Sequence, residues 1–243
     1  GMDISDISLP GNQLELIETL KKFGKPIIAV LIAGRPYDIT RVSEIADAVL
    51  AAWYPGEEGG RALSDILTGK VNPSGKLSVS IPYAPTCLPA YYNRITSSQS
   101  SVSDDWVVNT YGDNNKRVLY PFGYGLSYSD FEYASMEVTK KDSCLFEVKA
   151  VVRNVSDIGG KETVQLYIHG KGNSIRRRVK ELKSFKKIYI APHSEQTVTF
   201  TLGYDELRIF SCNNRYELEN GKVEIYIGSG DNLPLRTEIE IRV

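Results

Sequence analysis

The spacing of apolar residues changes along this 243-residue sequence, and that change limits the possible folds most. Before about residue 82, apolar residues occur in short continuous runs, such as Pro26–Ala33 and Val49–Tyr54. Runs of this length are typical of parallel strands that are buried on both faces. From about Ser129 onward, apolar and polar residues alternate, which is typical of strands with one buried face. The sequence therefore predicts two parts with different architectures.

The first part alternates between predicted helices and predicted strands. Turn residues such as Gly24 and Gly69 separate the segments. This order predicts right-handed crossovers onto a parallel sheet. The predicted helices are Leu14–Leu20, Val42–Ala48 and Arg61–Leu67, and a further strand is predicted over Leu77–Ser80.

The pattern of the second part predicts a β-sandwich, because short segments of alternating apolar and polar residues follow one another with regular turns. Residues 94–118 are polar and predict a long surface loop between the two parts. The predicted strands of the sandwich are Phe146–Arg153, Thr163–Ile168, Lys186–Ile190, Thr197–Leu202, Val223–Ile227 and Glu238–Val243.

Composition excludes several classes of protein. The 29 Lys and Arg residues nearly balance the 30 Asp and Glu residues, so the charge excess of a nucleic-acid-binding protein is missing. No apolar run approaches the ~20 residues of a membrane-spanning helix. The three cysteines, Cys87, Cys144 and Cys212, have no metal-site spacing, and we expect neither a metal nor a cofactor. With no signal peptide visible at the N-terminus, we expect a cytoplasmic protein.

Several longer motifs occur in a characteristic order. The most specific is YPFGYGLSY at Tyr120–Tyr128. It follows DISLPGNQ at Asp6–Gln13, WYPGEEGG at Trp53–Gly60 and NPSGKL at Asn72–Leu77, and it precedes GKETVQLY at Gly160–Tyr167. In this order the motifs resemble the C-terminal portion of glycoside hydrolase family 3, the β-glucosidase and β-xylosidase family.

The resemblance implies an α/β plus all-β architecture. Residues 1–128, including the loop at about 94–118, correspond to the C-terminal part of the family's α/β sandwich domain, with its parallel sheet. Residues 129–243 correspond to its fibronectin type III-like, or immunoglobulin-like, β-sandwich.

The resemblance also implies that the catalytic carboxyl groups lie outside this sequence. Retaining enzymes use a nucleophile and an acid/base. In the family, the nucleophile is an Asp on an N-terminal barrel, a fold of ~250 residues. The acid/base Glu lies just upstream of the segment that resembles Asp6–Gln13, which places it immediately before Gly1. We therefore expect no catalytic residue here, and turnover of a β-glucoside or β-xyloside only when the missing barrel completes the protein.

Some residues could be mistaken for catalytic groups. Asp105 lies in a Ser-Asp-Asp-Trp sequence that resembles the family's nucleophile motif, but no strand precedes it. Glu57 and Glu58 are adjacent, and their position favours the N-terminus of a helix over catalysis. We reject all three as catalytic residues.

Three aromatic residues are candidates for the border of a sugar-binding cleft. Trp106, Tyr91 and Tyr92 lie in predicted loops and could offer flat faces to a sugar ring, although packing is the common role of such residues.

The remaining charged motifs favour structural roles. The basic run at Arg176–Lys180 predicts a solvated hairpin. We interpret His169 and His193 each as a strand-end or turn residue and not as a base.

Half of an α/β domain leaves an open sheet edge and an uncovered apolar face. We therefore expect self-association, or a separate chain that covers the edge. Three functions remain open: part of a β-glycosidase, a non-catalytic carbohydrate-binding module, or a protein-interaction module.

Overall fold

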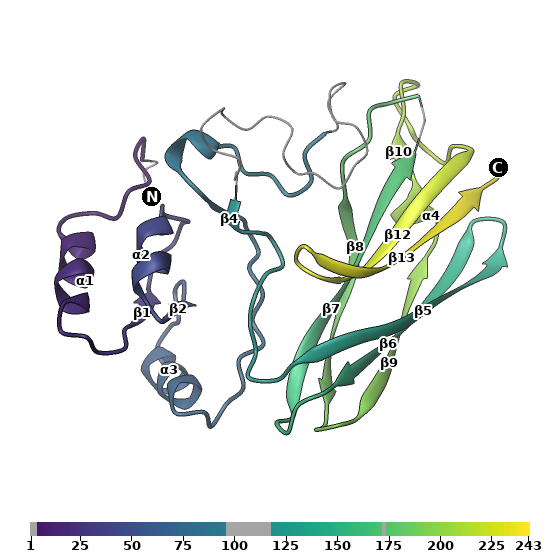
Figure 1. Ribbon diagram of the computed structural model, residues 1–243. Coiled ribbons are helices and arrows are strands. Elements are labelled where there is room, and N and C mark those ends of the chain that lie inside the picture. The colour runs from purple at the N-terminus through teal and green to yellow at the C-terminus, as the bar shows by residue number, and fades with distance from the viewer. Residues whose placement is uncertain (1–3, 96–117, 172–173) are drawn as a thin grey trace. The chain divides into compact units, whose positions relative to one another are not determined.

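The computed structural model describes residues 4–95, 118–171 and 174–243 (Figure 1). These residues form two compact units. The α/β unit contains the described residues up to Val71, together with 78–91 and 118–122. The sandwich unit contains 72–77, the described residues from Tyr92 to Ile95, and those from Gly123 onward. None of the helices in these ranges is long and apolar enough to cross a membrane.

The α/β unit contains the predicted alternation of helices and parallel strands. Strands β1 and β2 pair in parallel, with Ile28 opposite Ala48 and Leu31 opposite Ala51. Helix α2 ends three residues earlier than predicted, because the β2 ladder already begins at Ala48. The elements are α1 (Gln13–Lys21), β1 (Ile28–Leu31), α2 (Thr40–Ile45), β2 (Ala48–Ala51), α3 (Gly59–Leu67), β3 (Ile81–Pro82), the 3₁₀ turn Pro85–Cys87 and β4 (Val118–Tyr120).

Two predictions for this unit are wrong. Leu77–Ser80 is not a strand, because the backbone of Leu77 bonds to Tyr124 O and to Gly123 N at 2.8 and 2.7 Å. The β1 run is not buried on both faces either, since Ile28 is 52% exposed and Ile32, just after the strand, is 62% exposed. In the described part of the chain this sheet has two strands, so much of its apolar surface has no cover.

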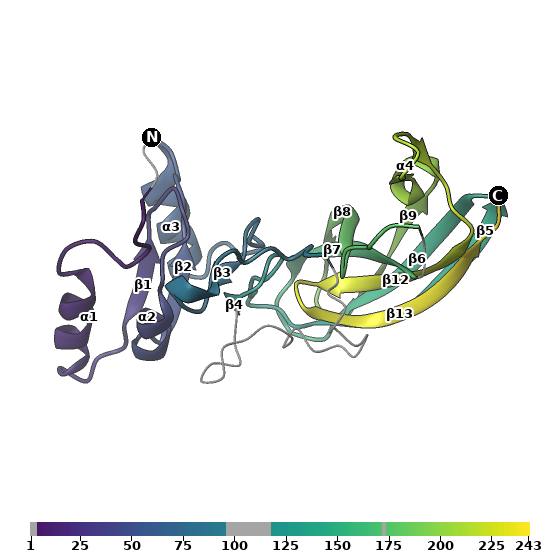
Figure 2. The same ribbon diagram turned by 90° about the horizontal axis from the view of Figure 1, so that it is seen from above.

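The sandwich unit consists of two antiparallel sheets that face each other (Figure 2). One has the order β5-β6-β9 and the other β13-β12-β7-β8. The sequence did not indicate β5, whose ladder with β6 shifts register between Tyr133 and Ser135. The strands are β5 (Phe131–Asp142), β6 (Leu145–Asn154), β7 (Gly160–Lys171), β8 (Glu181–Ile190), β9 (Glu195–Leu202), β12 (Gly221–Ser229) and β13 (Asn232–Ile241).

The core lies between these two sheets. Alternate residues of β6, including Val148 and Val152, point inward and are fully buried. They meet buried residues of the opposite sheet, such as Ile168 on β7 and Ile225 on β12. The period of two in the sequence therefore has its physical cause in this face-to-face packing.

Glu224, on β12, is the centre of a charged network. Its carboxylate pairs with Lys171 Nζ at 2.7 Å and with Arg236, and it accepts a hydrogen bond from the Tyr226 hydroxyl at 2.6 Å. Burial alone would raise the pKa of Glu224, but the bonds from Arg236, Lys171 and Tyr226 outweigh it and lower the pKa to about 2. The network therefore stabilises the fold when the Glu224 carboxyl group is ionised.

We predict that Glu224→Gln flattens the dependence of stability on pH in acid. A depressed carboxyl pKa gives stability that is present above the unfolded-state pKa and lost as pH falls through the folded-state pKa. Between about pH 4.5 and 2, the wild type should therefore lose more stability than Glu224→Gln. Urea midpoints across this range measure the difference, with Glu137→Gln, at an exposed position of β5, as the control. Parallel pH profiles for the wild type and Glu224→Gln would contradict the prediction.

Candidate functional site

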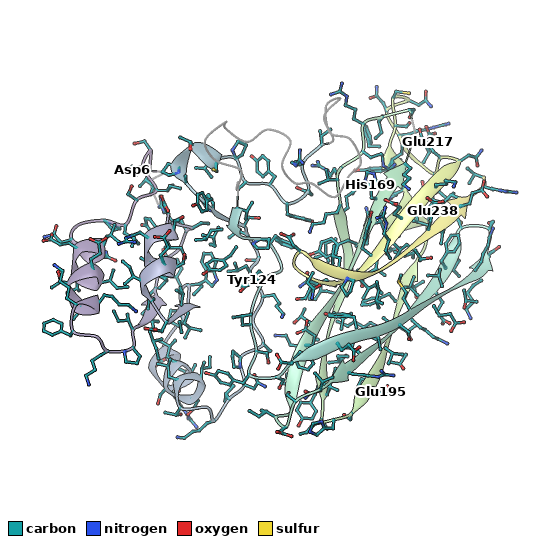
Figure 3. All side chains as sticks on the ribbon, viewed as in Figure 1. Asp6, Tyr124, His169, Glu195, Glu217 and Glu238 are labelled. Carbon is teal, nitrogen blue, oxygen red and sulfur yellow. The ribbon has the colours of Figure 1, made fainter. Side chains whose placement is uncertain are left out.

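The two most specific motifs meet at one place in the sandwich unit. The NPSGKL turn over 72–77 and residues 123–128 of YPFGYGLSY pair through Leu77 and Tyr124, which is labelled in Figure 3. The approach is so close that a side chain at Gly125 would overlap the Gly75 carbonyl oxygen. Both segments also contact residues of β7, the strand that contains the GKETVQLY motif.

Glu162 of β7 forms a buried ionic cluster with this turn. Lys76 Nζ lies 3.1 Å from Glu162 Oε2, and the two side chains are only 11% and 3% exposed. The Tyr133 hydroxyl donates to Glu162 Oε1 at 2.8 Å, and Lys76 also donates to the Gly125 carbonyl at 2.7 Å. A carboxylate removed from water in this way requires a cation and hydrogen-bond donors. The cluster therefore fixes the NPSGKL turn on the sandwich.

Gln165, farther along β7, holds the neighbouring segment. Its amide donates to the Gly123 carbonyl at 3.1 Å, and its side-chain oxygen accepts from the Gly230 N–H at 3.1 Å. Gly123 has φ +82°, and a Cβ there would overlap the Gln165 side-chain oxygen. Glycine is required at this position for both reasons.

Asn72 joins three segments with one side chain. Its amide nitrogen donates to Ser129 Oγ at 2.7 Å and to the Gly159 carbonyl at 3.2 Å. Its oxygen accepts from Ser127 Oγ and from the Tyr128 N–H, each at 2.8 Å. The first residue of one motif therefore fixes the last residues of the other.

We predict that Lys76→Met destabilises the chain by about 3–5 kcal/mol, because it leaves Glu162 charged, buried and without its cation. The double variant Lys76→Met/Glu162→Gln should lose less than the sum of the two single variants, since neither charge then remains. Urea unfolding followed by far-UV circular dichroism measures both effects. Arg153→Gln, at an exposed pair with Glu195, is the control and should leave the midpoint almost unchanged. Additive losses in the double variant would show that Lys76 and Glu162 are not coupled.

The structure describes only some of the residues singled out as possible cleft or catalytic groups. Asp105 and Trp106 lie outside the described residues. Tyr91 is exposed, whereas the Tyr92 ring packs edge-on against Tyr167 with centroids 6.3 Å apart. Tyr92 therefore has a packing contact, and the roles of Tyr91 and Tyr92 at a sugar-binding cleft both stay predictions.

The adjacent pair Glu57 and Glu58 lies at the start of α3. Both side chains are exposed, and Glu58 occupies the N-cap position without a side-chain capping bond.

The prediction of a solvated basic hairpin is wrong for two of its residues. Arg177 and Lys180 are buried. Lys180 Nζ donates to Asp231 Oδ1 at 2.9 Å and lies 5.0 Å from the centroid of the Tyr167 ring. Burial lowers the pKa of Lys180, although Asp231 opposes the change. The segment packs onto the sandwich unit, so Arg177 and Lys180 are buried while Arg176 and Arg178 stay exposed.

Both histidines are held by hydrogen bonds to residues distant in sequence. His169, labelled in Figure 3, lies near the end of β7 with Nδ1 2.8 Å from the Arg178 carbonyl. His193 lies in the turn after β8, with Nε2 2.7 Å from Asp157 Oδ1. Within the described ranges, no group of three or more His, Cys, Asp and Glu residues is arranged to hold a metal ion.

Two carboxyl groups of the α/β unit are held in the ionised form. Asp6 accepts the Ser8 N–H at 2.8 Å, and Asp47 accepts the Ile27 N–H at 2.8 Å, and these bonds lower the pKa of each carboxyl group. A general acid needs the opposite change, a raised pKa that retains the proton near neutral pH. Both groups are therefore suited to structural bonding.

Comparison with known proteins identifies the family. Residues 1–128 match the glycosyl hydrolase family 3 C-terminal domain, and residues 162–230 match a fibronectin type III-like domain. The chain belongs to glycoside hydrolase family 3. Lys76 lies in the first matched range and Glu162 in the second, so their ion pair joins residues of both matched domains. No pattern in the sequence indicated that these two residues form a pair.

Curated family 3 relatives match over nearly the whole chain. A periplasmic β-glucosidase of Salmonella typhimurium is 34% identical over 92% of this chain and 30% of its own length. A β-xylosidase of Formosa agariphila is 35% identical over 94% of this chain and 31% of its own length. The chain thus spans about a third of each relative. The name of the first relative places that protein in the periplasm, so the cytoplasmic location of this chain stays a prediction.

A solved structure shows the same fold. The β-glucosidase from Listeria innocua, in complex with isofagomine, is 34% identical and aligns with a TM-score of 0.91. The alignment covers 98% of this chain and 34% of that one.

Proposed function

We propose that these residues are the C-terminal part of a β-glycosidase and hydrolyse no glycoside alone. The observation that carries this proposal is that the family 3 match covers about a third of each curated relative. The family's nucleophile and acid/base belong to parts that precede this sequence. A β-glucoside or β-xyloside is the substrate of the completed enzyme.

The incomplete sheet of the α/β unit supports the same proposal. Parallel sheets in proteins are covered by other elements on both faces. In the described chain, however, β1 and β2 each have one edge without a strand partner. Apolar side chains remain exposed in this unit, among them Phe23 just after α1, Ile28 in β1 and Ile32 just after β1. The missing strands of the family 3 domain are the occupant that fits this surface, whether they belong to the same polypeptide or to a separate one.

Without that occupant, we expect the uncovered surface to drive self-association. Large apolar patches and unpaired strand edges recruit partners.

We predict that residues 1–243 alone hydrolyse neither p-nitrophenyl β-glucoside nor p-nitrophenyl β-xyloside above the blank. A fusion that replaces the C-terminal third of the Listeria innocua enzyme with this chain should regain hydrolysis of at least one of them. Replacement of that third by the sandwich residues 129–243 alone is the control and should stay inactive. Turnover by the isolated chain would contradict the proposal, and so would an inactive fusion whose circular dichroism shows that it is folded.

We predict that the isolated chain is not a monomer at micromolar concentration. Phe23→Asp/Ile32→Lys should shift its mass in light scattering toward the monomer, because the charges interrupt the apolar surface of the α/β unit. Phe185→Asp, at an exposed residue of β8 in the sandwich unit, is the matched control and should leave the mass unchanged. A compact monomer in the unmodified chain would contradict the expectation.

A further inference from the structure

A group of exposed aromatic residues lies on the sandwich unit, away from the motifs that meet on β7. Between β9 and β12 the chain forms α4 (Tyr204–Leu207), β10 (Ile209–Phe210) and β11 (Tyr216–Glu217). Strands β10 and β11 pair with each other and with neither large sheet. Figure 2 shows α4 standing off the two sheets.

This excursion is fixed to the core at its base. Leu207 and Ile209 are buried, and Leu207 belongs to the core between the sheets. Glu206 accepts the Gly203 N–H at 2.8 Å and closes the start of α4. The Ser211 N–H bonds to the Arg215 carbonyl at 3.0 Å and closes the turn between β10 and β11. The base of the excursion is therefore tied to the core.

Three aromatic side chains form that surface, which we call the aromatic platform: Tyr204, Phe210 and Tyr216. They are 44%, 53% and 56% exposed. The rings of Phe210 and Tyr216 pack edge to face with centroids 5.2 Å apart. The Tyr204 hydroxyl donates to the Tyr216 carbonyl at 2.9 Å. The rings are thus held together while about half of each residue still faces water.

Polar groups of fixed position surround the aromatic platform. Glu217, labelled in Figure 3, accepts from Asn213 Nδ2 at 3.0 Å and from Arg215 Nε at 2.6 Å. Hydrogen bonds from Ser211, Asn213 and Arg215 lower the pKa of Glu217 to about 2, so the carboxylate is ionised at neutral pH. The Arg208 guanidinium lies 4.5 Å from the centroid of the Tyr216 ring.

The charges beside the platform cancel in pairs. Arg208 pairs with Asp205 at 3.3 Å, and Arg215 pairs with Glu217 at 2.6 Å. A binding surface for a nucleic acid or another polyanion needs an excess of positive charge, which these pairs do not provide. The platform is instead matched to an uncharged ligand that has apolar faces and a polar edge.

We infer that the aromatic platform is a non-catalytic binding surface for a neutral polysaccharide made of β-linked pyranose units. A pyranose ring has C–H groups on its faces, which pack against the electron-rich faces of aromatic rings. Its hydroxyl groups lie at the edge, where carboxylate, amide and guanidinium groups can bond to them. The choice of β-linked units rests on the proposed function, whereas binding itself requires no catalytic group.

Affinity gel electrophoresis in mixed-linkage β-glucan or xylan tests this inference on the full chain. Each gel is compared with one that lacks polysaccharide. We expect at least one of these polymers to retard the wild type, and Phe210→Ala/Tyr216→Ala to weaken binding by roughly tenfold or more. Phe185→Ala, at an exposed ring on β8, should be retarded like the wild type. Tyr216→Phe should also keep most of the retardation, because it preserves the ring and the backbone carbonyl that Tyr204 bonds.

Two results would overturn the inference. The first is that neither polymer retards the wild type. The second is that the wild type and the double alanine variant are retarded equally, while the circular dichroism of the variant is unchanged. If that double variant is unfolded, then retardation equal to the wild type in both single variants, Phe210→Ala and Tyr216→Ala, overturns it instead. Light scattering provides the remaining test: a shift of the double alanine variant to the monomer would make the platform an interface between copies of this chain. Because the readout is binding, a failure here leaves the hydrolysis test of the fusion unaffected.

Discussion

The buried pair of Lys76 and Glu162 determines what belongs to the sandwich unit. Glu162 lies in β7, at the centre of the larger sheet, and its carboxylate is almost completely removed from water. Its cation comes from a turn that is distant in sequence, so the strand and the turn must fold together. Asn72 and Gln165 extend this dependence to the segments around Ser129 and Gly123. A cut at residue 129 would therefore leave a buried carboxylate without its partner, even though the sandwich strands themselves begin after that position.

The glycine-rich motif acquires a physical explanation from the same interaction. Gly123 and Gly125 lie where the chain must pass against Gln165 and against the Gly75 carbonyl. A side chain at either position would separate the segments, and Lys76 could then no longer reach Glu162. The close approach of Lys76 to Glu162 and the glycines at 123 and 125 therefore belong to one packing arrangement.

Local pattern was sufficient to predict most of the fold. The alternation around Val148 and Val152 placed β6, because each buried residue there meets the opposite sheet directly. It did not reveal β5, where the ladder shifts register near Tyr133. The burial of Arg177 and Lys180 was also missed, since a run of basic residues normally faces water. Lys180 is buried because Asp231, from the turn between β12 and β13, supplies a partner that only the folded chain brings close.

Exposed apolar residues in the two units have different physical causes. In the α/β unit they adjoin strands whose edges lack partners in the described chain, so completion of the sheet is sufficient to explain Ile28 and Ile32. In the sandwich unit the two sheets already enclose a continuous core, and Leu207 anchors the excursion that carries Tyr204, Phe210 and Tyr216 to that core. No missing strand is needed there to complete the packing. A fixed group of half-exposed rings on a complete core instead has the character of a surface that binds a ligand, and its paired charges favour a neutral one.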